Sequence, residues 1–257
     1  MKNLSCKKIG ARVVPALASG LALALGAAVT GYAEDRYLSE EELYAFDDSE
    51  SMNVYDPLEP LNRVTFQFND YVILKLIDPV TGFYEKIVPE SLDRGAENFF
   101  DNLNYPVRLA GNLLQGRFKA AGVETGRFAV NATSGLGGIL SVADSIEGLE
   151  RPPQEDIGQA FGSWGIAEGP YLILPFLGPS NFRDLGGRVA DRAVQPLDEP
   201  FRAIGDSELS AALSGTELLV TGQRFVRQYR QMKENALAPY SSLRNAYTDR
   251  RRAMIEE

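Results

Sequence analysis

Apolar residues recur along most of this 257-residue chain at intervals of three and four, the spacing of one helix face. In the first such stretch of the folded part, Asp56 is placed to cap a helix, Pro57 to occupy its first turn and Glu59 to complete a capping box. We expect this helix to end at Ile77, before Asp78-Pro79, because proline disrupts a helix interior. Its apolar positions are Leu61, Val64, Phe68, Tyr71 and Val72.

The same spacing continues downstream and is interrupted by glycines and prolines. Small residues crowd the stretch 117–133, which favours close helix packing, either in a membrane or in a water-soluble bundle. Because helix signals outnumber strand signals, we predict a mainly α fold. The further expected helices are 91–103, 107–114 after a break at Tyr105-Pro106, 117–133, 154–161, a long helix from Asp206-Ser207 through Tyr229, and a final amphipathic helix after Pro239-Tyr240.

Residues 168–187 do not follow the helical spacing. Glycines and prolines flank an apolar run from Tyr171 to Leu177, which is too short to cross a bilayer as a helix. Two interpretations stay open for this region: a β-hairpin, or an irregular apolar segment that lies against lipid. We assign Gly186-Gly187 to the end of this turn-rich region.

The start of the chain has the three parts of a secretory signal peptide. Basic residues precede an apolar stretch from Val13 to Val29, and the small residues Gly31 and Ala33 follow at cleavage-site spacing. We predict a signal peptide at 1–33 with cleavage after Ala33, an uncleaved membrane anchor being the alternative. Residues 34–55 are predominantly acidic and predict a flexible leader, and 56–257 form the expected folded domain.

Composition limits the chemistry. The chain contains no histidine and one cysteine, Cys6, which lies inside the expected signal peptide. The mature chain therefore excludes a disulfide, a Cys/His zinc site and a Ser-His-Asp triad. Carboxylate chemistry and a calcium or magnesium site remain as options. We predict no catalytic residues, no metal and no cofactor.

Charge limits the partners. The formal net charge is −9, and removal of residues 1–33 takes away four basic residues and no acidic ones. An acidic chain disfavours nucleic acid, which requires a basic footprint. Association with a membrane must then come from apolar faces or from a protein partner.

Three short motifs have alternatives that carry no catalysis. The loop Gly135–Gly138 lacks the Gly-Lys-Ser/Thr ending of a phosphate loop. Ser163 sits in a run that resembles a nucleophile elbow, but it has no histidine to activate it. The pairs Arg183-Asp184 and Asp191-Arg192 either neutralise each other in the fold or contact a lipid headgroup.

The run Asp56-Pro57-Leu58-Glu59-Pro60-Leu61-Asn62-Arg63, with Phe66 and Asn69, resembles the MlaA (VacJ) family of outer-membrane phospholipid-transport proteins. The resemblance extends in order from Asp56 to about Pro200. Its further motifs are Arg94-Gly95, Asn98-Phe99-Phe100, Asn112-Leu113-Leu114-Gln115-Gly116, Thr125-Gly126-Arg127-Phe128, Asp156-Ile157-Gly158-Gln159, Gly169-Pro170-Tyr171 and Arg183-Asp184.

The resemblance implies a ring-like bundle of amphipathic helices, with an irregular apolar segment, on the periplasmic side of the outer membrane. Phospholipid from the outer leaflet would pass through a hydrophilic channel in the ring to a soluble periplasmic carrier, and onward to an inner-membrane ATP-driven transporter. Family members associate with trimeric porins, and the family performs no bond-making chemistry. The candidate lipid-path residues that match family motifs are Asn62, Arg63, Phe68, Asn69, Arg183 and Asp184.

One departure concerns anchoring. Many family members carry a lipid-modified cysteine at the mature N-terminus, whereas the predicted cleavage here leaves Glu34. We therefore expect membrane retention without acyl modification. Two competing hypotheses remain: a structural partner of porins with no lipid passage, and a lipid hydrolase, for which the sequence offers no convincing set of residues.

Overall fold

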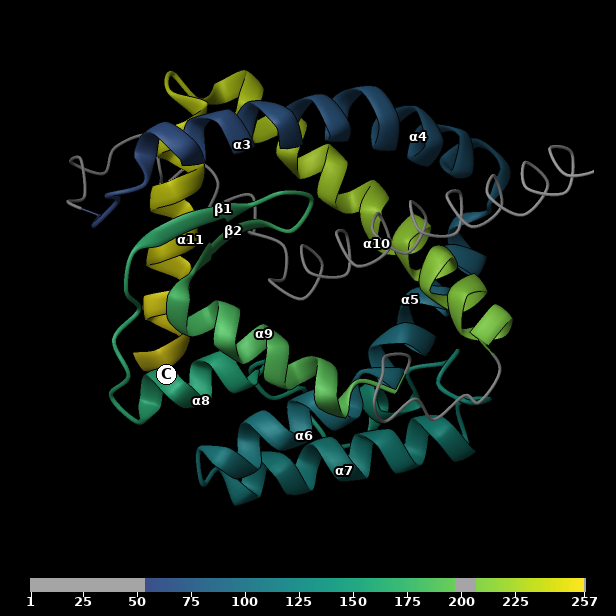
Figure 1. Cartoon of the computed structure of the whole chain (residues 1–257). Coiled ribbons are helices and arrows are strands. Elements are labelled where there is room, and N and C mark those ends of the chain that lie inside the picture. Colours follow the sequence, from purple (N-terminus) through teal and green to yellow (C-terminus); the bar gives the residue numbers. More distant parts are fainter. Residues whose placement is uncertain (1–53, 197–206, 257) are drawn as a thin grey trace, which may run out of the picture.

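The structure is a computed structural model that describes residues 54–196 and 207–256. The expected signal peptide, its cleavage after Ala33 and most of the acidic leader lie outside these residues. The described part is mainly helical and ring-like, with a small hairpin on the inner side of the ring (Figure 1). The elements are α3 (Glu59–Val72), the π-helix η1 (Ile73–Ile77), α4 (Asp78–Ile87), α5 (Glu90–Leu103), α6 (Tyr105–Leu114), α7 (Phe118–Thr133), the 3-10 helix η2 (Val142–Ser145), α8 (Ile157–Ser163), β1 (Tyr171–Leu174), β2 (Gly178–Asn181), α9 (Phe182–Val194), α10 (Ser207–Asn235) and α11 (Pro239–Glu256).

The helical segment that begins with α3 does not end before Asp78-Pro79, where the sequence predicted an end. It continues through η1 into α4, so that residues 59–87 form one side of the ring (Figure 1). The N–H of Asp78 donates to the carbonyl of Ile73, five residues earlier, in the wider π pattern. Because Pro79 lies in the first turn of α4, this widened turn accommodates its ring and its missing N–H.

Asp56 does not cap the first helix. Helix α3 begins at Glu59, with Leu58 in the N-cap position and no side-chain cap. The Asp56 carboxylate instead accepts hydrogen bonds from the Asn62 amide at 2.8 Å and from the Tyr240 hydroxyl. The start of the domain is therefore tied to the last helix.

The apolar run after Gly169 forms a hairpin, one of the two expected alternatives. Strands β1 and β2 pair antiparallel, with Tyr171 opposite Asn181 and Leu174 opposite Gly178. Phe176, in the three-residue turn between them, has a φ of 63°, in the left-handed region. The hairpin packs against α3 on one side and leads directly into α9.

The helix α9 contradicts the assignment of Gly186-Gly187 to a turn. Both glycines lie inside α9, which packs closely on α8. A Cβ atom on Gly187 would lie 2.3 Å from the Cα of Gly158 in α8. The glycine is thus required for close helix contact rather than for a turn.

Most other boundaries agree with the spacing. The break between α5 and α6 lies at Asn104, and Pro106 occupies the first turn of α6, where a missing N–H is tolerated. Asp156 caps α8 by accepting from the N–H of Gln159 at 2.6 Å. Helix α7 begins at Phe118, one residue after the predicted start.

The fold has no single large apolar core among the described residues. One cluster joins the hairpin to α11, and a second joins η1 to α10. Buried polar side chains are at least as common as buried apolar ones, which is the reverse of a typical water-soluble domain. The first cluster is formed by Val54, Tyr171, Ile173, Tyr240 and Tyr247, and the second by Ile73, Val226 and Tyr229.

Candidate functional site

A polar cavity of about 330 Å³ lies between α5, α6, α8, α10 and α11. This volume falls at the lower end of the range of ~300–1,000 Å³ typical of ligand pockets. The cavity is surrounded by elements from most of the length of the described chain, because the ring brings them together (Figure 1). Its charged lining residues are Glu97, Asp101, Arg108, Arg151, Glu155, Asp156, Glu217 and Arg224.

The inner faces of two amphipathic helices supply much of this lining. Helix α5 contributes Glu97 and Asp101, four residues apart, and α10 contributes Glu217, Thr221 and Arg224 at helical spacing. The same helices pack against each other. Consequently the polar faces of α5 and α10 meet inside the ring instead of facing outward.

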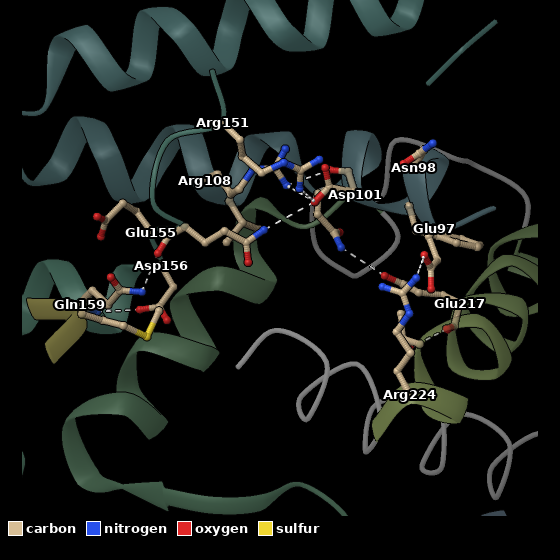
Figure 2. A pocket seen from close by; sticks show the side chains of 16 residues that line it. Glu97, Asn98, Asp101, Arg108, Arg151, Glu155, Asp156, Gln159, Glu217 and Arg224 are labelled. Atoms are coloured by element: carbon tan, nitrogen blue, oxygen red, sulfur yellow. Dashed lines mark hydrogen bonds and ion pairs between the residues drawn. The ribbon is translucent and has the colours of Figure 1, made fainter. Parts of the chain in front are cut away.

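One side of the cavity, which we call the Glu97 end, contains Glu97, Glu217 and Arg224 (Figure 2). Arg224 pairs with Glu97, and the Asn104 amide donates to Glu217 at 3.2 Å. Burial raises the pKa of the Glu97 carboxyl, and the charge of Arg224 offsets this only in part. Arg224 therefore does not fully offset the unfavourable burial of the charged Glu97 carboxylate.

The opposite side, which we call the Gln159 end, contains Glu155, Asp156 and Gln159 (Figure 2). Gln159 is 1% exposed and its amide nitrogen donates to the carbonyl of Gln154 at 3.0 Å. Glu155 accepts from the Gln115 amide at 2.5 Å and pairs with Arg117.

Between the two ends lie Asp101, Arg108 and Arg151 (Figure 2). Arg151 contacts Asp101 at 3.1 Å, and Arg108 contacts the same carboxylate at 3.5 Å. Arg108 also donates from Nε to Glu124 at 3.0 Å. A guanidinium group presents five N–H donors in a plane and suits phosphate.

The outer side of the α3–η1–α4 wall has the opposite polarity. Its large apolar side chains are exposed, Val64 and Phe83 each to 65%, while Asn62 and Asn69 on the inner side are 2% and 3% exposed. A helix in a water-soluble protein buries its apolar face instead. We call the exposed set the outer stripe; it comprises Leu61, Val64, Phe68, Tyr71, Leu76, Val80, Phe83 and Ile87.

Asn62 and Asn69, two of the sequence-predicted lipid-path residues, hold the hairpin. Asn62 donates to the carbonyl of Tyr171 at 3.0 Å and accepts from the N–H of Ile173 at 2.8 Å. Asn69 makes the same pair of contacts three residues further along the hairpin: it donates to the carbonyl of Leu174 and accepts from the N–H of Phe176. Neither asparagine lines the cavity.

Arg63 and Phe68 lie on the more exposed side of α3. Arg63 pairs with Glu59 at 2.7 Å, and its guanidinium lies 4.4 Å from the ring centre of Tyr240. Phe68 packs edge-on against Phe176 at the tip of the hairpin, with ring centres 5.0 Å apart. Phe68 is also part of the outer stripe, at the edge of the stripe next to the hairpin.

Arg183 and Asp184 lie in a buried ion cluster at the junction of α8, α9 and α11. Asp184 accepts from Arg183 Nε at 2.9 Å, from Arg251 Nε at 3.0 Å and from the Tyr247 hydroxyl at 2.6 Å. Burial alone raises the pKa of Asp184, but the two arginines outweigh it and bring the pKa down to about 2. We define the buried ion cluster as Asp156, Arg183, Asp184, Asp191, Tyr247 and Arg251.

Asp191 is the exception in this cluster. Burial raises its pKa, and the neighbouring Asp156 carboxylate raises it further, to about 8. Its carboxyl group accepts from the N–H of Ile157 at 3.0 Å. The pair Asp191-Arg192 therefore does not neutralise itself in the way that Arg183-Asp184 does.

The hydroxyl of Ser163 donates to the carbonyl of Ala160 at 2.8 Å, three residues earlier in α8. Within 54–196 and 207–256, no group of three or more His, Cys, Asp or Glu residues is placed to hold a metal ion. Nor is any helix in this part of the chain long and apolar enough to span a bilayer.

Sequence reasoning missed the residues that line the cavity. Glu97, Asp101 and Arg224 are polar positions on amphipathic helices, and such positions normally face water. The only available signal was that α5 and α10 are polar at i, i+4 and i+7 positions, which does not reveal that these two faces meet.

Comparison with known proteins gives consistent matches over the folded part. The family model described as MlaA lipoprotein matches residues 54–254. The intermembrane phospholipid transport system lipoprotein MlaA of Escherichia coli K12 is 36% identical over 138 residues, covering 53% of this chain and 55% of that protein. The protein of the same name from Haemophilus influenzae is 33% identical over 139 residues, covering 54% of this chain and 56% of that protein.

A longer match is an uncharacterised protein of Rickettsia prowazekii, 28% identical over 235 residues, covering 88% of this chain and 89% of that protein. A solved chain from work on the structural basis for maintenance of bacterial outer membrane lipid asymmetry superposes with a TM-score of 0.65 at 29% identity. The superposition covers 78% of this chain and 98% of the solved one. The mainly helical fold that the sequence predicted, and the ring-like arrangement that the family resemblance implied, are thereby confirmed.

Proposed function

Because the chain belongs to the MlaA lipoprotein family, we propose that it maintains outer-membrane lipid asymmetry by removing phospholipid from the outer leaflet. The phospholipid headgroup passes through the polar interior of the ring and is handed to a soluble periplasmic carrier. A trimeric porin holds the ring in place on the periplasmic side of the outer membrane. No covalent bond is made or broken in this process.

The observation that carries the proposal is the reversed polarity of the ring. The outer stripe exposes apolar side chains, while the interior contains a charged cavity lined by five acidic and three basic residues. A phospholipid has a charged head and apolar tails, so its transfer requires a polar path for the head beside an apolar surface for the tails. The charged cavity and the exposed apolar stripe of this ring support such a transfer.

The outer stripe also offers a means of membrane retention that needs no lipid-modified cysteine. Transfer of a large apolar side chain out of water contributes on the order of 1.5–3 kcal/mol. Several side chains of the stripe acting together are sufficient to hold the ring at an apolar surface. We expect Val80→Glu with Phe83→Glu to release the protein from the membrane fraction, whereas Arg227→Glu, a charge change outside the stripe, leaves it bound.

The test measures phospholipid exposed in the outer leaflet of cells that lack the protein, with and without a complementing copy. We expect exposure to rise and complementation to reverse it. Thr221→Trp fills part of the cavity and should fail to complement. Thr216→Trp is the matched control, because both threonines lie on α10 and donate to the carbonyl four residues earlier, but Thr216 is exposed.

Full complementation by Thr221→Trp would contradict passage through this cavity. Unchanged outer-leaflet phospholipid combined with a porin defect would favour the alternative function, a structural porin-associated envelope protein without lipid passage.

A further inference from the structure

Two side chains that line the cavity each carry an oxygen acceptor with no hydrogen-bond partner within residues 54–196 and 207–256. One is Oε1 of Glu97 at the Glu97 end, and the other is Oε1 of Gln159 at the Gln159 end. Buried polar atoms in native proteins are nearly always satisfied by a protein group, water or a ligand. Two acceptors that line one cavity therefore indicate an occupant that donates hydrogen bonds.

Gln159 is the stronger sign, because its side chain is almost fully buried and its amide nitrogen donates to the carbonyl of Gln154. Its amide oxygen is buried beside the cavity and has no partner among the described residues. Glu97 adds charge: its other carboxylate oxygen is engaged by Arg224, while burial penalises the charged form. A second cation beside Oε1 would offset that penalty.

The net charge of the residues that line the cavity indicates which hydrogen-bond donor the ligand carries. Acidic residues exceed basic ones by five to three, and each of the three arginines already contacts a carboxylate. An anionic headgroup would add negative charge to this excess. A quaternary ammonium carries no N–H, so it would leave both acceptors unsatisfied.

We propose that the cavity prefers phospholipids whose headgroup carries a primary ammonium group next to the phosphate. The ammonium donates to Oε1 of Glu97 and to Oε1 of Gln159 at successive positions along the cavity. The phosphate lies between them, near Arg108 and Arg151, whose guanidinium groups carry further N–H donors (Figure 2). This substrate preference rests on the proposed function, since it concerns the lipid that passes through the ring.

The test measures which lipid the purified full-length protein retains from mixed micelles. The micelles contain equal amounts of phosphatidylethanolamine, phosphatidylglycerol and phosphatidylcholine with identical acyl chains, and the retained lipids are quantified by mass spectrometry. Hydrogen bonds to charged groups are stronger than neutral ones, so we expect phosphatidylethanolamine to be enriched roughly five- to tenfold over the other two.

Two variants at the acceptors and one matched control separate recognition from folding. Glu97→Gln should reduce the enrichment to about twofold or less, and Gln159→Leu should lower it independently. Glu85→Gln is the control, because Glu85 also pairs with an α10 arginine, Arg227 at 2.7 Å, but does not line the cavity. Retained enrichment in Glu85→Gln and its loss in Glu97→Gln would support the proposal.

Soluble glycerophosphoethanolamine, added at the same concentration as the lipid, distinguishes the membrane lipid from its free headgroup. Persistence of the bound lipid supports a phospholipid ligand, and its complete displacement would overturn that assignment. Equal retention of all three lipids would overturn the headgroup preference while leaving lipid transport intact. Retention of no lipid at all, together with unchanged outer-leaflet phospholipid in deletion cells, would overturn both.

Discussion

Two regions of the ring differ in how they place apolar and charged side chains. One is the α3–η1–α4 wall, and the other is the junction of α8, α9 and α11. The wall turns apolar side chains outward and anchors its inner face with asparagine amides that bind the hairpin backbone. The junction packs two helices at glycine contact distance and fills the remaining space with charged side chains. The wall is built for an apolar exterior, whereas the junction is held by interactions that depend on exclusion of water.

The contrast shows where stability resides in a ring that lacks a large apolar core. Neutral hydrogen bonds contribute about 1 kcal/mol each, but loss of one partner in a buried ion pair costs several times more. The junction should therefore be the more sensitive region, and the outer stripe the least sensitive in detergent solution. The following predictions are ordered by the size of the expected effect.

Arg251→Met should have the largest effect. It leaves Asp156 and Asp184, contacted by Arg251 at 2.6 and 3.0 Å, without their main counter-charge in a buried site. We expect a loss of about 3–5 kcal/mol in the free energy of unfolding, measured by denaturant titration in detergent. Arg252→Met is the control, since Arg252 is 43% exposed and its pair with Glu168 should be worth less than about 1 kcal/mol. Equal losses in the two variants would contradict the importance of the buried ion cluster.

Gly187→Ala tests the close approach of α9 to α8. The added methyl group meets the backbone of Gly158, which cannot rotate away as a side chain would. We expect a destabilisation of about 2–3 kcal/mol by thermal unfolding. Gly122→Ala in α7 has open space around it and should be neutral or stabilise by up to about 1 kcal/mol. A neutral Gly187→Ala would mean that the two helices separate easily.

Asn62→Ala and Leu61→Ala compare the two faces of α3 directly. Loss of the Asn62 side chain leaves the carbonyl of Tyr171 and the N–H of Ile173 without this partner, which should cost about 1–3 kcal/mol. Leu61 is 62% exposed, and its replacement should change the free energy of unfolding in detergent by less than about 0.5 kcal/mol. A larger loss from Leu61→Ala would indicate that the outer stripe packs inward.

At pH 5 Asp191→Asn should have the smallest effect of these variants, and the effect should grow as the pH rises. The folded pKa of about 8 exceeds the unfolded value of about 4, so between these values the folded chain holds a proton that the unfolded chain has lost. Stability from this group is therefore present below pH about 4 and is lost as the pH rises to about 8. The variant should flatten this decline, so that its gain over the wild type rises from about 1 kcal/mol at pH 5 to several kcal/mol at pH 8, as measured by unfolding at both pH values.

Asp184 provides the opposite sign as an internal check. Its folded pKa of about 2 lies below the unfolded value, so its contribution is present above pH about 4 and is lost as the pH falls towards 2. If the wild-type protein gained stability between pH 5 and 8, the raised pKa of Asp191 would be contradicted.

Helical spacing predicted most helices because their apolar faces repeat regularly, whichever side they turn to. Periodicity does not tell whether such a face meets protein or lipid, so the outward orientation of Leu61 and Val64 came only from the structure. Pro79 was misjudged because a local rule expects a helix end there, whereas a π turn absorbs the proline. Gly187 was misjudged because glycine is required there by close contact with Gly158 of α8, which lies 29 positions away in the sequence.

The candidate site was predicted less well than the fold. Asn62 and Asn69 are seven residues apart and share one face of α3, but their hairpin partners lie more than 100 residues downstream. The cavity residues come from α5, α6, α8, α10, α11 and the segment before α8, and no local pattern indicates which of their polar positions face one another. The sequence showed which positions of these helices are polar. It did not show which helices, distant in the sequence, bring their polar faces together.

The contact between Asp56 and the last helix sets an order on how the chain can fold. Asp56 meets Tyr240 and Arg244, the latter at 3.5 Å, and these partners are made 184 and more residues later. The ring consequently cannot close until the segment that forms α11 is available, and long-range closure of this kind is slow. Until α11 emerges, the inner amides of α3 stand open to water, so a chain truncated before Pro239 would be an unclosed arc rather than a smaller ring.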